Sequence, residues 1–199
     1  MHISEGVLSA PVLAAGWAVT AGGLAIGLRK TPVEELPKTA LVSGVLFLIS
    51  LVHVPLGPSS IHLTLLGLAG VLLGWSAIPA LFTALFLQGL LLQFGGLLSL
   101  GVNTAVMGSA ALAGCAVFKA LPRRVYLPAA FAAGFIAVIT GAVLVTAALF
   151  FSSGNLALTA TLIFAANLPL AAVEGAITVL MVLFLGRALP DYVFGQTGI

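Results

Sequence analysis

The sequence predicts an all-α, polytopic membrane helix bundle of about seven transmembrane helices, forming a single integral membrane domain over residues 1–199. Of the 199 residues, 61% are hydrophobic and only 6% are charged, and the mean hydropathy is +1.28. A soluble domain has about 25% charged residues. A net charge of +2 is too small to suggest nucleic acid as a partner, and the single cysteine, Cys115, cannot form an internal disulfide.

Six polar or Gly/Pro-rich stretches interrupt the apolar runs: "RKTPVEELPK", "PLGPSS", "GWSAIP", "QFGGLLSLG", "KALPRR" and "FSSGN". Because a helix needs roughly 20 apolar residues to cross a bilayer, they leave about seven spans, near 10–28, 39–55, 61–77, 79–94, 101–118, 126–150 and 156–186. The spans at 61–77 and 79–94 are short, so one of them is expected to be broken or little tilted. In the last one, "NLP" at 167–169 predicts a short outer helix and then a true span from about 165.

The basic residues predict the orientation, because Lys and Arg collect in cytoplasmic loops. With seven spans, all seven fall on one side: Arg29, Lys30, Lys38, Lys119, Arg123, Arg124 and Arg187. The N-terminus is therefore expected outside, the C-terminus inside, and residues 188–199 form a cytoplasmic tail after the bundle at 10–187. All three histidines, His2, His53 and His62, then lie on the outer face.

Residues 1–9, which open with "MHISEG", are interpreted as a metal-binding segment rather than a signal peptide, since they lack a basic n-region. The amine of Met1, the backbone nitrogen of His2 and its Nδ1 atom can close two fused chelate rings on one ion. They supply three nitrogens in a plane, and a fourth donor completes the tetragonal geometry that Ni(II) and Cu(II) prefer. The alternative is an accidental exposed histidine.

His62 is the best candidate for the fourth donor, because the turn "GPSSIH" delivers it to the outer surface. His53 competes with it, and can equally be an interfacial residue without a ligand role. Glu5 either supports the site region or simply favours the start of the first helix, where an acidic residue is stabilised.

Three further features concern contacts within the membrane. Small residues at spacing four on the first span let helices approach closely, either inside the bundle or against a partner: Ala10, Ala14, Ala18 and Gly22. Asn103 follows a glycine-rich segment and is expected to form a hydrogen bond with that segment or with the N-terminal tail.

Glu174 is the one charge deep in a predicted span, which makes it a functional candidate or a hydrogen-bonded packing residue. We expect it about half a membrane from the histidines, and therefore not to bind the captured ion.

Several functions lose support because their motifs are missing. The sequence has no P-loop, HExxH or CxxC motif, so the chain is not expected to hydrolyse ATP or to be an enzyme. A secondary transporter or channel remains an alternative, although Glu174 and Asn167 alone make a poor polar pathway and no inverted repeat is visible. An intramembrane hydrolase with Ser109 as nucleophile lacks an adjacent base, because no histidine follows position 62.

Four stretches together resemble the CbiM/NikM family, the membrane substrate-binding components of energy-coupling-factor transporters for cobalt and nickel. They are "MHISEGVLS", "HVPLGPSSIHLTLLGLAGVLLG", "LQGLLLQFGGLLSLGVNTAVMG" and "NLPLAAVEG", which span nearly the whole chain. The resemblance implies about seven helices, a tucked-in N-terminus, and metal held by Met1, His2 and His62, with Asn103 in the site region. Ser4 departs from the Pro or Met expected there, at a position that donates no ligand.

The resemblance also implies partners: a membrane coupling protein, two cytoplasmic ATPase subunits, and in some systems a small accessory membrane protein. It implies the plasma membrane as location, no resident cofactor, and Co²⁺ or Ni²⁺ as the transported ligand. The sequence does not separate the two ions. Imidazole and amine nitrogen suit both, and the order of binding strength favours nickel.

Overall fold

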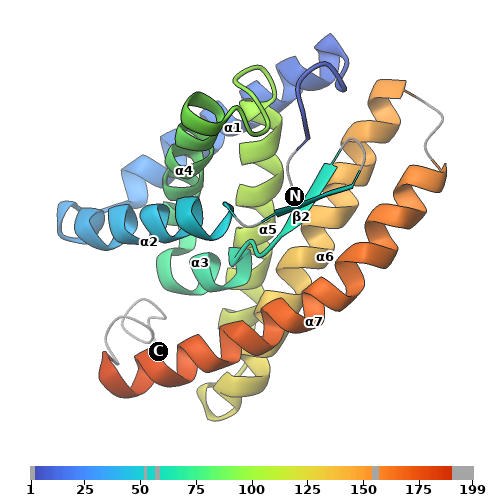
Figure 1. The fold of residues 1–199 in the computed structure, drawn as a ribbon. Coiled ribbons are helices and arrows are strands. Elements are labelled where there is room, and N and C mark those ends of the chain that lie inside the picture. The colour runs from blue at the N-terminus through green and yellow to red at the C-terminus, as the bar shows by residue number, and fades with distance from the viewer. Residues whose placement is uncertain (1–2, 52, 57–58, 154–156, 190–199) are drawn as a thin grey trace.

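The computed structural model describes residues 3–51, 53–56, 59–153 and 157–189, without the side chains of 53–62, 153 and 157–160. The helices and strands follow in the order α1 Ala10–Lys30, η1 Val33–Glu35, α2 Leu36–Ile49, β1 His53–Leu56, β2 Ser59–His62, α3 Leu66–Leu73, η2 Gly74–Ser76, α4 Ala77–Leu92, α5 Leu100–Ala120, η3 Arg123–Val125, α6 Tyr126–Ser153 and α7 Ala157–Ala188. Figure 1 shows a helical bundle with a small hairpin beside α5, α6 and α7. The predicted membrane helix bundle is confirmed.

Helix α5 is the centre of the bundle, and it packs against α1, α3, α4 and α6. Small residues make these contacts close. Gly16 of α1 lies so near Val102 of α5 that a Cβ at position 16 would overlap it, and Gly70 of α3 lies equally near the carbonyl of Ala111. The hydroxyl of Thr20 donates to the carbonyl of Gly101, at 2.6 Å. Because lipid is as apolar as leucine, such close packing and interhelical hydrogen bonds hold membrane helices together.

Five helical segments in the described part are long and apolar enough to cross a membrane: 10–30, 66–92, 100–120, 123–152 and 161–188. The chain is therefore a multi-pass integral membrane protein. The segment 66–92 is bent, because Gly74 between α3 and α4 adopts φ 55° and ψ −122°, which only glycine adopts readily. The expectation that one of the two short predicted spans is broken is met by α3, which has eight residues and is about 12 Å long.

Three predicted boundaries are wrong. The span expected at 39–55 ends as helix α2 at Ile49, after 14 residues or about 21 Å. The span expected at 61–77 begins with strand β2 rather than helix. The short outer helix expected before 165 is part of the continuous 32-residue α7. A proline inside a membrane helix is tolerated, and α7 continues through Pro169.

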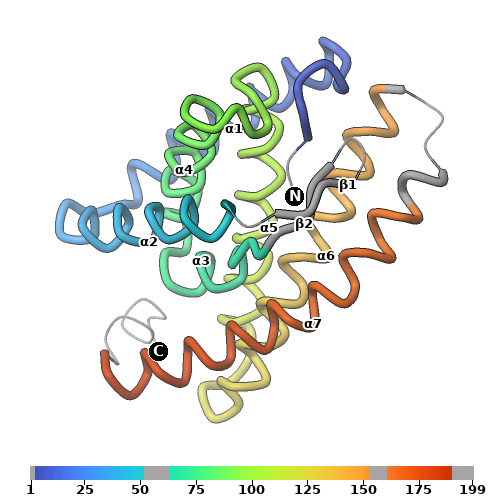
Figure 2. Tube along the Cα trace, viewed as in Figure 1, coloured from blue at the N-terminus to red at the C-terminus, as the bar shows by residue number. Residues whose placement is uncertain are grey.

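Strands β1 and β2 form an antiparallel hairpin among the helices, where the apolar pattern predicted membrane helix. Its register pairs His53 with His62, Val54 with Ile61, Pro55 with Ser60 and Leu56 with Ser59. Short apolar runs do not by themselves distinguish a strand from a helix segment. The tube in Figure 2, which has the same view, shows α6 and α7 running side by side.

Candidate metal-binding site

The N-terminal tail is docked into the bundle at Ile3. This residue is fully buried. Its N–H donates to Oδ1 of Asn103 at 2.9 Å, and its carbonyl accepts from Nδ2 of the same side chain at 3.1 Å. An amide side chain has both a donor and an acceptor, so Asn103 satisfies the backbone of Ile3 as a neighbouring strand would.

Asn103 is itself fixed by the glycine-rich loop before α5. Its Nδ2 also contacts Oγ of Ser99 at 3.3 Å, and Oγ of Ser99 donates to the carbonyl of Gly95. The expectation that Asn103 bonds the loop or the tail therefore holds for both. The contact with Ser99 orients the buried amide toward the tail.

Glu5 makes the second contact of the tail with this loop. Its Oε1 accepts from the N–H of Leu98 at 2.7 Å. Gly96, at φ +88°, lies directly beneath it, and a Cβ at Gly96 would overlap the Glu5 side chain. Only glycine combines this backbone angle with so close an approach. We call the contacts of Ile3 and Glu5 with Asn103, Leu98 and Gly96 the tail anchor.

The predicted ligands Met1 and His2 lie outside the described residues, and they join the chain directly before the anchored Ile3. For the third predicted ligand, His62, the structure describes the backbone at the end of β2. The register places His53 directly opposite His62. His53, the competitor from the sequence, thus belongs to the same segment, and His62 stays the predicted ligand.

Glu174 holds the segment that follows β2. It is fully buried on α7. Its carboxylate accepts from the Thr64 hydroxyl at 3.0 Å, from the Thr64 N–H, and from the Leu65 N–H at 2.8 and 3.0 Å. We call these contacts the hairpin anchor. The expectation that Glu174 lies half a membrane from the histidines is wrong, because Thr64 follows His62 by only two residues, which span at most about 7 Å.

Nearly the whole chain matches a known protein family. A family model described as "Cobalt uptake substrate-specific transmembrane region" matches residues 2–192. The chain belongs to the CbiM family.

Relatives and solved structures agree with this assignment. A Haemophilus influenzae protein, provisionally named a metal transport protein, is 36% identical over 197 residues, covering 96% of both chains. The fused nickel transport protein NikMN of Rhodobacter capsulatus is 35% identical over 117 residues, which cover 54% of this chain and 34% of that one. A crystal structure of a transition metal transporter has a TM-score of 0.81 at 25% identity and covers 94% of this chain and 93% of that one. This CbiM-family chain is therefore a component for cobalt or nickel transport.

Residues that sequence reasoning missed are those that support the site. Ile3, Ser99 and Thr64 were not singled out, although Ile3 and Thr64 each make a long-range contact within an anchor and Ser99 contacts Asn103. A buried isoleucine and two hydroxyl residues are ordinary in a membrane protein, and the partners of Ile3 and Thr64 are far away in the sequence. Glu174 was found by its charge alone, without its partners.

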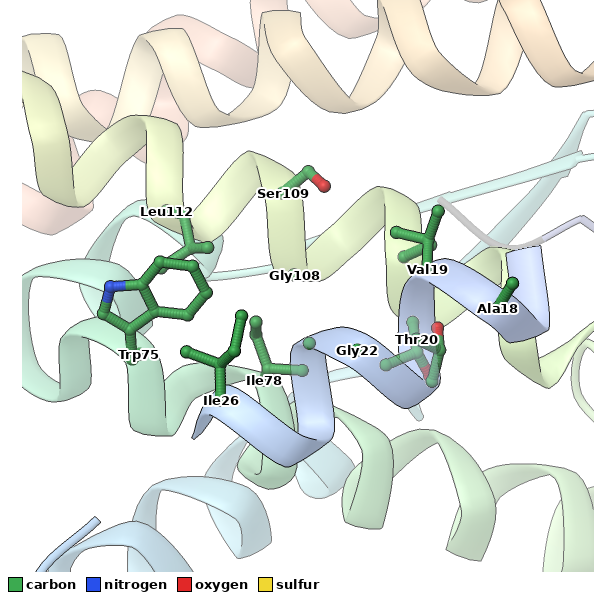
Figure 3. A pocket seen from close by; sticks show the side chains of 13 residues that line it. Ala18, Val19, Thr20, Gly22, Ile26, Trp75, Ile78, Gly108, Ser109 and Leu112 are labelled. Atoms are coloured by element: carbon green, nitrogen blue, oxygen red, sulfur yellow. The ribbon is translucent and has the colours of Figure 1, made fainter. Parts of the chain in front are cut away.

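The small-residue ladder of α1 faces away from the bundle, so the interpretation as packing inside the chain is wrong. All four members, Ala10, Ala14, Ala18 and Gly22, are exposed, whereas Gly16, Thr20 and Gly27 form the buried face. A groove of about 340 Å³ lies beside the ladder, between α1, α5 and residues 75–78 (Figure 3). Ser109 lines this groove. None of the described residues that line it is acidic, basic or a histidine, so the hydrolase alternative gains no support there.

Proposed function

We propose that this chain captures Co²⁺ or Ni²⁺ at the outer face of the membrane through the Met1 amine, the His2 backbone and imidazole nitrogens, and the His62 imidazole. The observation that supports it most is the tail anchor. A hydrophobic protein buries Ile3 and spends two hydrogen bonds of a buried amide on the third residue of its chain. Holding the tail in this way makes chemical sense if the two residues before Ile3 bind something inside the bundle.

The hairpin, which ends in the other predicted ligand, His62, supports the same proposal. It gives the segment that ends in His62 a paired backbone beside α5 and α6. Two ligand-bearing segments, each fastened by a buried polar side chain, provide the fixed geometry that a planar nitrogen site needs. The ion is the transported substrate, and amine and imidazole nitrogens suit either metal.

The experiment that tests this site adds one residue before Met1. The extension turns the amine into an amide and removes the chelate while every side chain stays unchanged. We expect the purified protein to lose Ni²⁺ and Co²⁺ binding, measured by isothermal titration, as completely as the His2→Ala and His62→Ala variants. His53→Ala serves as the control and should bind nearly as tightly as the wild type. An extended chain with wild-type affinity would refute the amine ligand.

We further propose that the chain works with a membrane coupling protein and two cytoplasmic ATPase subunits, with or without an accessory membrane protein. Support comes from the exposed ladder and from the fused state of NikMN. The ladder and the groove beside it offer a flat, small-residue surface that lets a partner helix approach closely. An ATP-independent secondary transporter is the alternative, and a dependence of uptake on the proton gradient alone would favour it.

A matched pair of α1 variants tests the partner surface. Ala14→Leu changes the exposed ladder and should reduce co-purification with the coupling protein about tenfold or more, with metal binding by the isolated chain unchanged. Gly16→Ala changes the buried face, where a Cβ would overlap Val102, and should lower the thermal stability of the isolated chain instead. If Ala14→Leu also destabilises the isolated chain, or leaves co-purification intact, the ladder is not the partner surface.

A further inference from the structure

Glu174 receives its hydrogen bonds from one short segment of the chain. The Thr64 hydroxyl and the N–H groups of Thr64 and Leu65 all point at its carboxylate. Both Thr64 and Glu174 are buried, at 2% and 0% exposure. A carboxylate buried in a membrane protein is costly unless it is well paired. Three donors from two consecutive residues provide that pairing and fix where the segment lies.

The segment is the start of helix α3, and Glu174 caps it from another helix. The first N–H groups of a helix lack partners inside the helix and favour a negative charge. Leu65, the residue before α3, has φ 51° and ψ 27° and supplies no side-chain cap. Glu174 of α7 instead accepts from the N–H groups of Thr64 and Leu65, the two residues directly before the helix, and so holds the backbone that enters it.

Helix α3 cannot easily follow a displaced segment, because its own backbone is in close contact with neighbours. A Cβ at Gly67 would overlap Gly134 of α6, and one at Gly70 would overlap the Ala111 carbonyl of α5. All eight residues of α3 are buried. Position 64 is thus held on one side by a packed helix and on the other by a carboxylate, and β2 leads directly into it.

We propose that Glu174 is a positioning residue for the metal site, which fastens the strand bearing His62 so that the site is formed before the ion arrives. This inference rests on the proposed function, since it requires His62 to be a ligand. Glu174 acts through the backbone of Thr64 and Leu65 and does not bind the ion. Partners of metal ligands that lie one contact further out typically change affinity by about 10- to 100-fold when they are removed.

The test uses three variants of the full chain in detergent. One changes Glu174, and two replace threonines whose hydroxyls both form hydrogen bonds with Glu174. Glu174→Gln keeps the size but places an NH₂ group among three donors. Thr64→Val removes one donor to the carboxylate. Thr178→Val is the control, because the Thr178 hydroxyl also bonds Glu174, but at its backbone carbonyl within α7, at 2.7 Å. Three readouts are taken: Ni²⁺ affinity, hydrogen exchange of residues 53–66 in the metal-free protein, and X-ray absorption of the bound nickel.

We expect Glu174→Gln to weaken Ni²⁺ binding about 10- to 100-fold, Thr64→Val to weaken it less, and Thr178→Val to leave it within about twofold. Exchange over residues 53–66 should rise in the first two variants and stay at the wild-type level in the third. X-ray absorption at saturating nickel should show the wild-type nitrogen environment in all variants, since Glu174 is not a ligand.

Three other results would overturn the inference, and each would indicate a different reason. Wild-type affinity and exchange in both Glu174→Gln and Thr64→Val would show that the contact positions nothing. Equal losses in Thr64→Val and Thr178→Val would indicate general packing, and a changed metal environment would make Glu174 a ligand. If Glu174→Gln fails to fold, the comparison of Thr64→Val with Thr178→Val still tests the inference. If the wild type binds neither nickel nor cobalt, the proposed function fails, whereas the exchange comparison still tests the hairpin anchor; if it binds cobalt only, the same comparison is made with Co²⁺.

Discussion

The tail anchor and the hairpin anchor solve the same problem with opposite chemistry. Asn103 meets one extended residue, Ile3, which offers an N–H and a carbonyl, and an amide complements both. Glu174 meets the start of a helix, which offers donors only, and a carboxylate accepts them all. The comparison teaches that the backbone being held determines the side chain that holds it. Among the described residues, Glu174 of α7 is the one buried acid, and it meets N–H and O–H donors.

The anchors differ in exposure as well. The hairpin anchor is entirely buried, whereas the tail anchor combines buried Asn103 with exposed Glu5. The tail anchor therefore has a strong inner contact and a weaker outer one, which gives variants of graded effect. Three predictions follow from this gradation, and each keeps the hairpin anchor intact.

The largest effect is expected from Asn103→Leu. It leaves the N–H and carbonyl of buried Ile3 without partners, at about 1–3 kcal/mol each. The tail then undocks, and affinity falls with the docked fraction. We expect Ni²⁺ binding in isothermal titration to weaken about 100-fold or more. Thr104→Val is the control. Its buried hydroxyl has no hydrogen-bond partner, and its loss should leave affinity unchanged. Near-wild-type binding by Asn103→Leu would mean that tail docking is irrelevant to the site.

An intermediate effect is expected from Gly96→Ala, compared with Gly6→Ala. Both glycines have positive φ, at 88° and 80°, so both alanines strain the backbone by about 1 kcal/mol. Only at Gly96 would the new Cβ overlap Glu5, whereas Gly6 has nothing within 4 Å. We expect Gly96→Ala to lower Ni²⁺ affinity about tenfold and Gly6→Ala to lower thermal stability slightly without changing affinity. Equal affinities for the two would remove Glu5 from the tail anchor.

The smallest effect is expected from Glu5→Gln. The glutamine carbonyl can still accept from Leu98 N–H, so the contact at 2.7 Å survives without its charge. Ni²⁺ affinity should fall no more than about threefold, because an exposed charge contributes little. Glu5→Ala, which removes the acceptor, should reduce affinity further in the same titration. A large loss with Glu5→Gln would show that the charge itself acts on the ion. The tail anchor would then depend on a charged side chain, as the hairpin anchor does.

The bundle was largely predictable, because composition and apolar run length decide whether a chain crosses a membrane. The runs at 101–118 and 126–150 match α5 and α6 within three residues. Failures cluster at 39–77, where α2 stops short and the hairpin and the half-length α3 follow. A short apolar run suits a strand as well as a helix segment, and only the folded chain distinguishes the two.

The candidate site, like the fold, was predictable from the sequence only in part. The sequence by itself determined which residues have the right chemistry: a Met-His start, a histidine after a turn, an amide beside a glycine pair, and one deep carboxylate. Local chemistry is written in residue identity and short spacing, so it can be read without a fold. The tertiary structure alone decided that Asn103 holds Ile3, that Glu174 holds Thr64 and Leu65, and that the Ala10–Gly22 ladder faces outward. The two anchor contacts join residues about 100 positions apart, and the outward ladder depends on which face of α1 meets α5, so packing and not sequence spacing sets all three.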